Sequence, residues 1–390
     1  MSRVRNSPRA SGLQMLRIAI VHPFPWPEVR RGAERYLDDL SRYLAERGHE
    51  VVVITGTHGR GRRDQRSDGV TVRYRRHLPP GPIARFGITR VETFGMQALA
   101  ALLRERADVV HAFTPSAALA GRLARLPTLY TVLGHPTAAQ LPSDRVPRML
   151  FASAVRTATV TAVLSHASAA ALASSLGTTS IVLPPGVRLE CFPPNLEPRT
   201  GPPRMLFSAS LSDPRKRADL AVAVLARVLE RHPESRLGLS GEGDAGWVLA
   251  AASDLGAPVR AAIDVLGAGD PAEVPGRYRS ATVTILPSEH EAFGLALLES
   301  LASGTPVVCS PAGGMPEIVS RAVGNVAASS APDALAEAVE ATIALAVHPT
   351  TSSSCVERAR RWSWDSAVGP AHERLYDEMK ANVAITPGPW

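Results

Sequence analysis

Residues 281–317 read ATVTILPSEHEAFGLALLESLASGTPVVCSPAGGMPE, and this stretch holds two strand patterns with a helical pattern between them. The apolar run Val283–Leu286 is typical of a strand that is buried on both faces. A polar loop, Glu289–Glu291, leads into a helical pattern at 294–303, and a second apolar strand is expected at 306–309. This order indicates a βαβ unit, whose two strands run parallel in one sheet.

The same alternation of strand and helix continues on both sides of this unit. Further strands are expected at 16–21, 50–55, 70–75, 108–112, 128–132, 159–164, 179–183, 205–208 and 236–240. Helical spacing of apolar residues predicts helices between most of these strands, for example at 33–47, 217–231 and 246–254. The sequence therefore predicts an α/β protein with doubly wound parallel sheets, in which ligand sites lie beyond the carboxyl ends of the strands.

A proline-rich stretch divides the chain into two similar α/β halves. Residues 192–203, FPPNLEPRTGPP, hold five prolines, which interrupt both helices and sheet ladders, so this stretch is expected to be a linker. A chain of 390 residues also favours two or three domains. We expect a disordered basic tail at 1–15, then an N-terminal Rossmann-like domain at 16–195 and a C-terminal one at 200–362, facing a central cleft.

The composition excludes several classes of function. Of 43 Lys and Arg residues, only Lys216 and Lys380 are lysines, and neither ends the Gly-rich run that a P-loop ATPase or GTPase needs. The net charge of +7 would attract nucleic acid, but aromatic residues make up only 5% and the sequence has no zinc-finger or RNP motif, so no nucleic-acid partner is expected. The three cysteines, Cys191, Cys309 and Cys355, are too far apart to indicate a disulfide framework or a zinc site.

The sequence patterns favour a cytoplasmic protein. The apolar run after residue 15 is too short for a signal peptide, and no segment approaches the roughly 18 uninterrupted apolar residues of a transmembrane helix. Residues 60–76 carry seven arginines against two aspartates. This basic stretch is expected to be a solvated loop and edge strand. The alternative is a patch for a phosphorylated acceptor or an anionic membrane, which would place the protein peripherally at the inner membrane face.

Two glutamates bracket the start of the helical pattern at 294–303. Glu291 lies in the loop before it, and Glu299 lies inside it, five residues after Gly294. A glycine at a helix entry lets backbone N–H groups approach a ligand closely, and a helix N-terminus attracts anions. Carboxylates accept hydrogen bonds from sugar hydroxyls. The pattern therefore points to a ligand that carries both hydroxyl groups and negative charge.

Glu291-Ala292-Phe293-Gly294-Leu295, with Glu299 eight residues after Glu291, resembles the E-x7-E motif of retaining GT-B glycosyltransferases of family 4, the glycosyl transferases group 1. Segments that resemble other parts of these enzymes follow in the same order at 29–55, 108–111, 181–192, 237–244, 304–308 and 313–317. The resemblance implies a GT-B fold of two Rossmann-like domains, with a last helical pattern at 366–381 that returns to the first domain.

The resemblance also implies the reaction. A hexose would pass from a UDP- or GDP-linked sugar donor to a hydroxyl of a small-molecule, glycan or lipid acceptor, with retention of anomeric configuration. The N-terminal domain would bind the acceptor and the C-terminal domain the donor. The sequence shows no dense carboxylate cluster, so neither a metal nor a cofactor is expected.

The resemblance assigns catalytic roles to three residues. Lys216 would stabilise the negative charge of the departing nucleoside diphosphate, Glu291 would contact hydroxyls of the transferred sugar, and His135 would face its outer hydroxyls. Among the donor-binding residues, Glu299 would hold the ribose hydroxyls. The full set of expected donor-binding residues is Gly32, Ser210, Arg215, Gly241, Phe293, Gly294, Leu295 and Glu299.

Three positions depart from the family pattern. Ser210 stands where the family has an arginine for the diphosphate, and Arg215 or Arg217 would have to supply that charge. Arg31 replaces one of the glycines in the opening N-terminal turn. The usual order of histidine and glycine is reversed at His135, which leaves its register open.

Three other functions are compatible with parts of the pattern. Gly241–Gly246 matches G-x-G-x-x-G, and Asp264 follows at the spacing of a ribose-binding acid, as in an NAD(P)-dependent oxidoreductase, although the motif lies mid-chain. A non-catalytic two-domain sugar-binding protein shares the expected cleft, but a periplasmic one needs an export signal. A glycosidase would need Glu291 and Glu299 to flank one scissile bond, whereas they belong to different parts of a helix entry.

Overall fold

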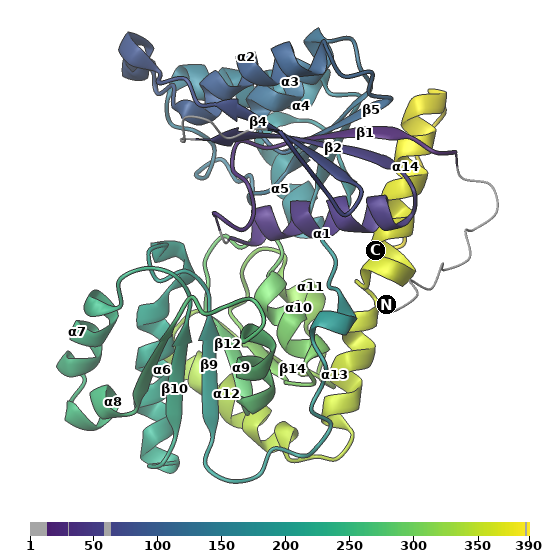
Figure 1. Cartoon of the computed structure of the whole chain (residues 1–390). Coiled ribbons are helices and arrows are strands. Elements are labelled where there is room, and N and C mark those ends of the chain that lie inside the picture. The colour runs from purple at the N-terminus through teal and green to yellow at the C-terminus, as the bar shows by residue number, and fades with distance from the viewer. Residues whose placement is uncertain (1–13, 30, 58–63, 387) are drawn as a thin grey trace. The chain divides into compact units, whose positions relative to one another are not determined.

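The computed structural model describes residues 14–29, 31–57, 64–386 and 388–390. They form two compact units, each an α/β unit with helices on both faces of a largely parallel sheet (Figure 1). The N-terminal unit comprises the chain up to Val163 together with 171–183 and 368–390, and the C-terminal unit comprises 164–170 and 184–367. The α/β class and the parallel sheets expected from the sequence are therefore confirmed.

The N-terminal unit is built on one eight-stranded sheet in the order β3-β4-β2-β1-β5-β6-β7-β8. Its neighbouring strands pair in parallel except for β3 and β4, which are antiparallel. The strands are β1 (Arg17–Val21), β2 (Glu50–Thr57), β3 (Gln65–Ser67), β4 (Val70–Arg76), β5 (Val109–Ala112), β6 (Thr128–Val132), β7 (Val160–Val163) and β8 (Ile181–Val182). β5, β6 and β7 are buried along their whole length, because helices cover both faces.

The helices of this unit follow the strands in the expected alternation. They are α1 (Gly32–Glu46), the 3-10 turn η1 (Gly81–Phe86), α2 (Arg90–Leu102), α3 (Pro115–Leu123), α4 (Arg145–Thr157), α5 (His166–Leu176) and α14 (Gly369–Ala381). α5 begins among residues of the C-terminal unit and ends in the N-terminal one. α1 is amphipathic: Tyr36, Leu40 and Leu44 are buried, whereas Arg42 is exposed.

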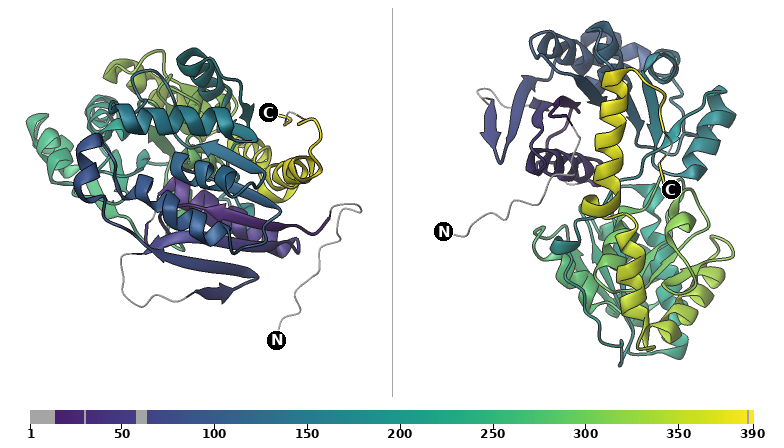
Figure 2. Two further views of the ribbon diagram at one scale, coloured as in Figure 1. Left: turned by 90° about the horizontal axis from the view of Figure 1, so that it is seen from above. Right: turned by 90° about the vertical axis from the view of Figure 1, so that its right-hand side faces the viewer.

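The C-terminal helix α14 belongs to the N-terminal unit (Figure 2). A buried polar network anchors it there. The Tyr36 hydroxyl of α1 lies 2.8 Å from His372 Nε2. His111 of β5 has its Nδ1 2.7 Å from the Tyr376 hydroxyl. The Tyr43 hydroxyl donates to Glu373 Oε2 at 2.8 Å. Because these groups are buried, each bond is formed with little competition from water.

This network is expected to make the N-terminal unit sensitive to acid. Burial lowers the pKa of His372 to about 4 and lowers the pKa of His111 well below its usual value. The unfolded chain therefore binds more protons than the folded chain between about pH 6.5 and 4, and stability falls as the pH falls through this window, by about 3 kcal/mol for His372 alone. Urea unfolding at several pH values should show a shallower pH dependence for His372→Gln. An exposed control, His348→Gln, should keep the wild-type slope, and equal slopes for all three proteins would contradict the prediction.

The C-terminal unit is built on a six-stranded sheet in the order β11-β10-β9-β12-β13-β14, with every neighbouring pair parallel. The strands are β9 (Arg204–Ser208), β10 (Arg236–Ser240), β11 (Ile263–Gly267), β12 (Val283–Leu286), β13 (Val307–Cys309) and β14 (Gly324–Val326). In sequence terms this is the order 3-2-1-4-5-6 of dinucleotide-binding folds. The sheet order therefore reverses between β9 and β12.

The helices of the C-terminal unit complete its core. They are α6 (Ala218–Arg231), α7 (Gly246–Asp254), α8 (Ala257–Ala261), α9 (Val274–Ser280), α10 (Leu295–Ala302), α11 (Met315–Ile318), α12 (Pro332–Ala346) and α13 (Thr351–Arg360). Short turns, η2 (Leu189–Cys191), η3 (Pro214–Lys216) and the π-helical η4 (Trp364–Val368), connect them to the strands and to α14. Apolar residues of α6 and α12 pack on β9, β10 and β12 in one buried cluster.

The proline-rich stretch 192–203, expected to be a linker, is part of the C-terminal unit. The division falls earlier, at Leu183 and Pro184, instead of between 195 and 200. Arg199 accounts for the packing of this stretch on the C-terminal unit. Arg199 is only 8% exposed, and its hydrogen bonds attach the stretch to that unit. Its guanidinium donates to the carbonyl oxygens of Asn195, Glu197, Ala281 and Gly304 and to Thr305 Oγ1.

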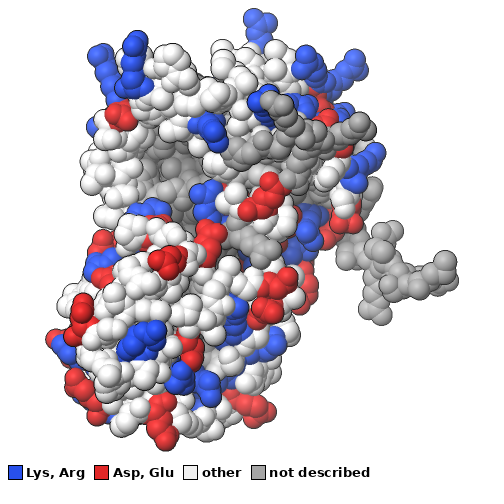
Figure 3. Space-filling view, turned by 60° about the vertical axis from the view of Figure 1, so that its left-hand side comes forward, with Lys and Arg blue, Asp and Glu red and all other residues white. Residues whose placement is uncertain are grey.

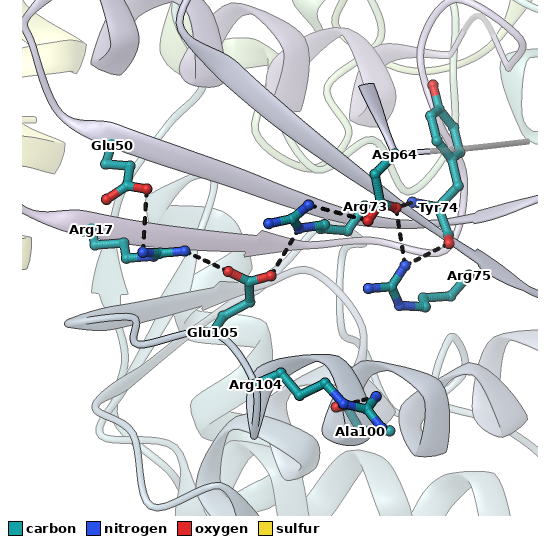
Figure 4. A network of polar contacts seen from close by, with 9 residues as sticks. All are labelled: Arg17, Glu50, Asp64, Arg73, Tyr74, Arg75, Ala100, Arg104 and Glu105. Carbon is teal, nitrogen blue, oxygen red and sulfur yellow. Dashed lines mark hydrogen bonds and ion pairs between the residues drawn. The ribbon is translucent and has the colours of Figure 1, made fainter. Parts of the chain in front are cut away.

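The basic stretch 60–76 is only partly within the described residues, since Arg60, Arg62 and Arg63 lie outside them. Figure 3 shows Lys and Arg side chains gathered on the N-terminal unit and both signs of charge mixed on the C-terminal unit. Arg73 and Arg75 both pair with Asp64 at 3.1 Å. Arg73 and Arg17 reach Glu105 from two sides (Figure 4). Of the seven arginines in the stretch 60–76, Arg73 and Arg75 are thus paired with carboxylates of their own unit. No helix in the described part of the chain is both long and apolar enough to cross a membrane.

Candidate active site

The loops that follow β9 and β12 meet at the point where the order of the C-terminal sheet reverses. Ligands of open α/β sheets bind at such a reversal, beyond the carboxyl ends of the two strands. The loop after β9 runs through η3, and the loop after β12 runs through Glu289 to the start of α10. The Glu289 N–H donates to the Arg215 carbonyl oxygen at 2.7 Å, so the two loops are joined directly.

Lys216 and Glu291, 75 residues apart in the sequence, form an ion pair at this junction. Their side chains are 24% and 17% exposed, so both are largely withdrawn from water but still reachable from it. The electrostatic interaction is therefore stronger than that of an open surface pair. The structure thus brings together two of the three residues expected to be catalytic.

Arg215 and Arg217 flank Lys216, and each has its own carboxylate partner. Arg215 Nη2 lies 2.7 Å from Asp213 Oδ2. Arg217 is held by Asp219 at 2.7 Å and also pairs with Glu289. The hydrogen bond to Asp213 raises the pKa of Arg215, and the one to Asp219 raises the pKa of Arg217. Lys216, Arg215 and Arg217 are therefore all paired with nearby carboxylates.

The loop after β13 packs against the backbone of Glu291 and forms a hydrogen bond with it. The Gly314 N–H donates to the Glu291 carbonyl oxygen at 2.9 Å. Gly313 has a φ of 58°, and a Cβ there would lie 1.8 Å from the same carbonyl oxygen. Only glycine permits this approach. The loop that carries Glu291 is therefore fixed between the β9 loop and the β13 loop, so its carboxylate is presented from a rigid backbone.

The N-terminus of α10 lies directly after this loop. Gly294 is its N-cap, with a φ of 107° in the left-handed region. Phe293 is 4% exposed and packs edge-on against Trp362, with ring centroids 6.1 Å apart, so it anchors the helix start instead of facing solvent. Leu295 is the first helical residue, and the first N–H groups of a helix have no partner within it. These groups can bind an anionic ligand.

Glu299 lies further along α10 and is 9% exposed. The Tyr278 hydroxyl of α9 donates to Glu299 Oε2 at 2.9 Å and is also 2.9 Å from Ser208 Oγ at the end of β9. Neither Tyr278 nor Ser208 was expected in the site from the sequence. The apolar and charged residues around Tyr278 form the pattern of an ordinary short helix. Nothing in that pattern indicates the contact with Glu299, 21 residues further along the chain. The buried Tyr278 hydroxyl therefore positions the Glu299 carboxylate, which can accept hydrogen bonds from ligand hydroxyls.

The glycine motif at 241–246 serves to pack two loops. A Cβ on Gly241 would lie 1.8 Å from the Ala209 carbonyl oxygen, and one on Gly243 would lie 2.3 Å from Ser212 Oγ. Ser210 lies in the same contact, with its hydroxyl 3.4 Å from the Glu242 carbonyl oxygen.

Asp264, the acid proposed for the oxidoreductase alternative, is on β11 and binds Arg236 of β10 at 2.7 Å. The hydrogen bond from Arg236 lowers the pKa of Asp264. The motif and the acid thus have structural explanations that need no dinucleotide.

Two expected site residues belong to the N-terminal unit. Gly32 is exposed and is the first residue of α1, whose N-cap Arg31 pairs with Glu34 at 2.5 Å. His135 is half-buried in the loop after β6, where its carbonyl oxygen accepts from the Thr137 N–H. Each therefore follows the carboxyl end of a strand in its own sheet. Within the described residues, no group of three or more His, Cys, Asp or Glu side chains is arranged to hold a metal ion.

Comparisons of the sequence with known proteins match both halves of the chain. The family model described as glycosyl transferases group 1 matches residues 192–362, and the one described as glycosyltransferase family 4 matches residues 30–190. The D-inositol 3-phosphate glycosyltransferase of Geodermatophilus obscurus is 30% identical over 97% of this chain and 93% of that protein.

Comparisons of the structure agree. Sucrose-phosphate synthase from Thermosynechococcus elongatus matches with a TM-score of 0.78 at 21% identity, over 94% of this chain and 100% of that one. Anabaena HepE, solved in complex with UDP-glucose, matches with a TM-score of 0.70 at 17% identity, over 94% of this chain and 100% of that one. At these identities the likeness establishes the fold alone. None of the matches described here is an oxidoreductase, and the comparisons do not support that alternative.

Proposed function

Because this chain belongs to the group 1 glycosyltransferases of the GT-B fold, we propose that it transfers a hexose from a UDP- or GDP-linked donor to an acceptor hydroxyl, with retention of anomeric configuration. The acceptor is a small molecule, a glycan or a lipid. The donor binds in the C-terminal unit, at the junction of the loops after β9 and β12. No metal ion or cofactor takes part in the proposed reaction.

The observation that carries this proposal is the meeting of Lys216 and Glu291 beside the N-terminus of α10. A diphosphate needs a cation and backbone N–H groups, and the transferred sugar needs a carboxylate for its hydroxyls. Glu299, further along, offers carboxylate acceptors for the ribose, and the buried Tyr278 hydroxyl positions that carboxylate. Glu291, the N-terminus of α10 and Glu299 follow one another in the chain, in the same order as the sugar, diphosphate and ribose of a nucleotide sugar.

Arg215 is the better candidate to replace the arginine that the family has at Ser210. Arg217 is held by two carboxylates, Asp219 and Glu289, and a diphosphate would have to displace both. The Arg215 guanidinium is paired with Asp213, and its side chain is 51% exposed. A diphosphate next to Lys216 can therefore recruit Arg215 at the expense of one exposed ion pair.

The chemistry needs charge stabilisation more than it needs a protein nucleophile. The bond from the anomeric carbon to the diphosphate oxygen breaks while the acceptor oxygen bonds to the same face, and the acceptor's proton passes to the departing phosphate oxygen. Lys216 and Arg215 stabilise the negative charge that develops on the leaving group. Glu291 is held by Lys216 and serves to position the sugar.

A panel of donors tests the proposal. UDP, GDP and their hexose conjugates are assayed by calorimetry and by donor hydrolysis, with NAD as the comparison. We expect binding by one nucleoside diphosphate series, and Glu299→Ala is expected to weaken it about 10- to 100-fold, because hydrogen bonds to a charged group are lost. Glu337→Ala, an exposed change on α12, is the matched control. Binding of NAD and of none of the nucleotides would contradict the proposal. So would equal affinity of Glu299→Ala and Glu337→Ala for the nucleoside diphosphate.

A further inference from the structure

The segment 78–86, between β4 and α2, exposes apolar side chains that the packing of its unit leaves in contact with solvent. Leu78, Ile83 and Phe86 are 43%, 45% and 48% exposed. Every residue of the 3-10 turn η1 is exposed, so this turn adds no buried side chain to the N-terminal unit. A run of exposed apolar residues next to charged groups is typical of an interaction surface.

The start of α4 lies beside the end of η1. Gly87, the C-cap of η1, has a φ of 76°, and a Cβ on it would lie 2.2 Å from Asp144 Oδ2. Asp144 is the N-cap of α4. Arg148 follows four residues later and therefore lies on the same side of α4 as Asp144. The exposed segment thus continues onto the first turn of α4, and we call residues 76–92 and 144–148 together the η1 surface.

The η1 surface carries more cations than carboxylates. Its arginines are all exposed, and they are Arg76, Arg85, Arg90, Arg145 and Arg148. Its carboxylates are Asp144 and Glu92, and Glu92 already accepts from the Thr89 N–H at 2.7 Å. Among the residues that the structure describes, Arg76, Arg85 and Arg148 lie within ion-pair distance of no carboxylate. The chain therefore leaves positive charge on this surface for an anionic partner.

Exposed apolar side chains among arginines fit the interface of an anionic lipid bilayer. There the apolar side chains enter the boundary between headgroups and acyl chains, and the arginines bind lipid phosphates. The Arg85 guanidinium lies 4.7 Å from the Phe86 ring centroid, so the cation and the ring would reach the headgroup region together. Nucleic acid would attract the same arginines but would offer no apolar environment for Leu78 and Ile83. A second copy of the surface would bring like charges together, which disfavours a dimer.

The η1 surface lies at the edge of the N-terminal sheet where its parallel strands end. β4 ends at Arg76, and the surface begins there. β6 ends at Val132, and the loop that leads from it to α4 contains His135. Ligands of open α/β sheets bind beyond the carboxyl ends of the strands. A bilayer at this surface would therefore lie at the same edge of the sheet as His135, which is expected to face the transferred sugar.

We propose that the η1 surface docks the N-terminal unit on an anionic lipid bilayer. Leu78, Ile83 and Phe86 enter the interface of the bilayer, and the arginines around them bind anionic headgroups. This docking does not depend on the proposed function. That the acceptor is a lipid, taken from the same bilayer, rests on the proposed function.

The test is sedimentation of the full chain with lipid vesicles, without donor or acceptor. One set of vesicles is phosphatidylcholine alone, and the other contains about one third phosphatidylglycerol. We expect at least about 10-fold stronger partition onto the anionic vesicles, and we expect about 0.5 M salt to abolish it, because salt screens the arginines. No binding to the anionic vesicles at millimolar lipid, or equal binding to both sets, would overturn the proposal. Because no donor is present, this result is independent of the donor panel.

Two matched pairs of variants assign the binding to the η1 surface. Phe86→Ser should lower partition onto the anionic vesicles about 5- to 20-fold, whereas Leu255→Ser, at a position 47% exposed in the C-terminal unit, should leave it unchanged. Arg85→Gln should lower it about 5-fold, and Arg260→Gln, an exposed change on α8, should not. Because η1 adds no buried side chain, Phe86→Ser and Arg85→Gln should keep the thermal stability and the nucleotide binding of the wild type.

Equal partition within either pair would refute the assignment to this surface. Self-association of the wild type in analytical ultracentrifugation that is lost in Phe86→Ser would assign the surface to a second copy of the chain, and it would also overturn the proposal.

Discussion

Replacing Lys216 with alanine is expected to lower the kcat of sugar transfer by about 10²- to 10³-fold, the typical cost of losing one donor that stabilises transition-state charge. The charge on the leaving diphosphate grows as the bond to the sugar breaks, so the loss should fall on kcat more than on donor affinity. Arg215 and the first N–H groups of α10 remain to bind the ground-state diphosphate. Steady-state kinetics with the donor identified by the panel, beside calorimetry of the nucleoside diphosphate, separate the two effects.

The chain provides its own control for this variant, because it has one other lysine. Lys380 lies on α14 of the N-terminal unit and pairs with Asp108 at 3.0 Å. Lys380→Ala removes the same side chain and the same charge far from the β9 loop in sequence, and its kcat should stay near that of the wild type. Unchanged turnover in Lys216→Ala, or an equal loss in both variants, would show that Lys216 does not stabilise the leaving group.

Glu291→Gln is expected to separate nucleotide binding from sugar transfer. Glu291 forms an ion pair with Lys216, so a diphosphate that binds to Lys216 must compete with this carboxylate. Removing its charge should tighten the binding of UDP or GDP alone by about 3- to 10-fold, the worth of a partly exposed ion pair. The same change should slow transfer about 10- to 100-fold, because the sugar loses a charged acceptor for its hydroxyls.

The two expected effects are opposite, because nucleotide binding tightens while sugar transfer slows. Glu291→Gln therefore tests whether Glu291 contacts the sugar and not the diphosphate. Glu230→Gln removes one negative charge from an exposed position on α6, and it controls for the general effect of charge on nucleotide affinity. Calorimetry with the nucleoside diphosphate and turnover with the sugar donor are measured for both variants. Weaker nucleotide binding in Glu291→Gln would mean that Glu291 supports the diphosphate directly, against the role proposed here.

Most of the secondary structure could be predicted from local pattern, because the strands of a doubly covered sheet are continuous apolar runs. The strands at 128–132 and 236–240 and the helix at 246–254 have the bounds expected from the sequence. The pattern was weaker at the sheet edge. β11 exposes Val265 and Leu266, so its burial alternates irregularly, and no strand was expected there.

Local pattern located the linker less well. Prolines reveal where regular structure stops, but they carry no information on which surface a segment packs against. The packing of 192–203 depends on Arg199, whose five acceptors come from residues up to 106 positions away. A single arginine in a proline-rich run gives no sign of such contacts. The proline-rich run therefore shows where the regular alternation stops, but it does not locate the division between the units at Leu183 and Pro184.

The sequence by itself was enough to assign the family and the α/β class. It also identified the charged residues near the start of α10. These follow from periodicity and from motifs whose residues are close together in the chain. The tertiary structure alone decided which side chains meet: Lys216 with Glu291, and Tyr278 with Glu299. The physical reason is the strand order, since the reversal between β9 and β12 joins loops that are 75 residues apart in the sequence.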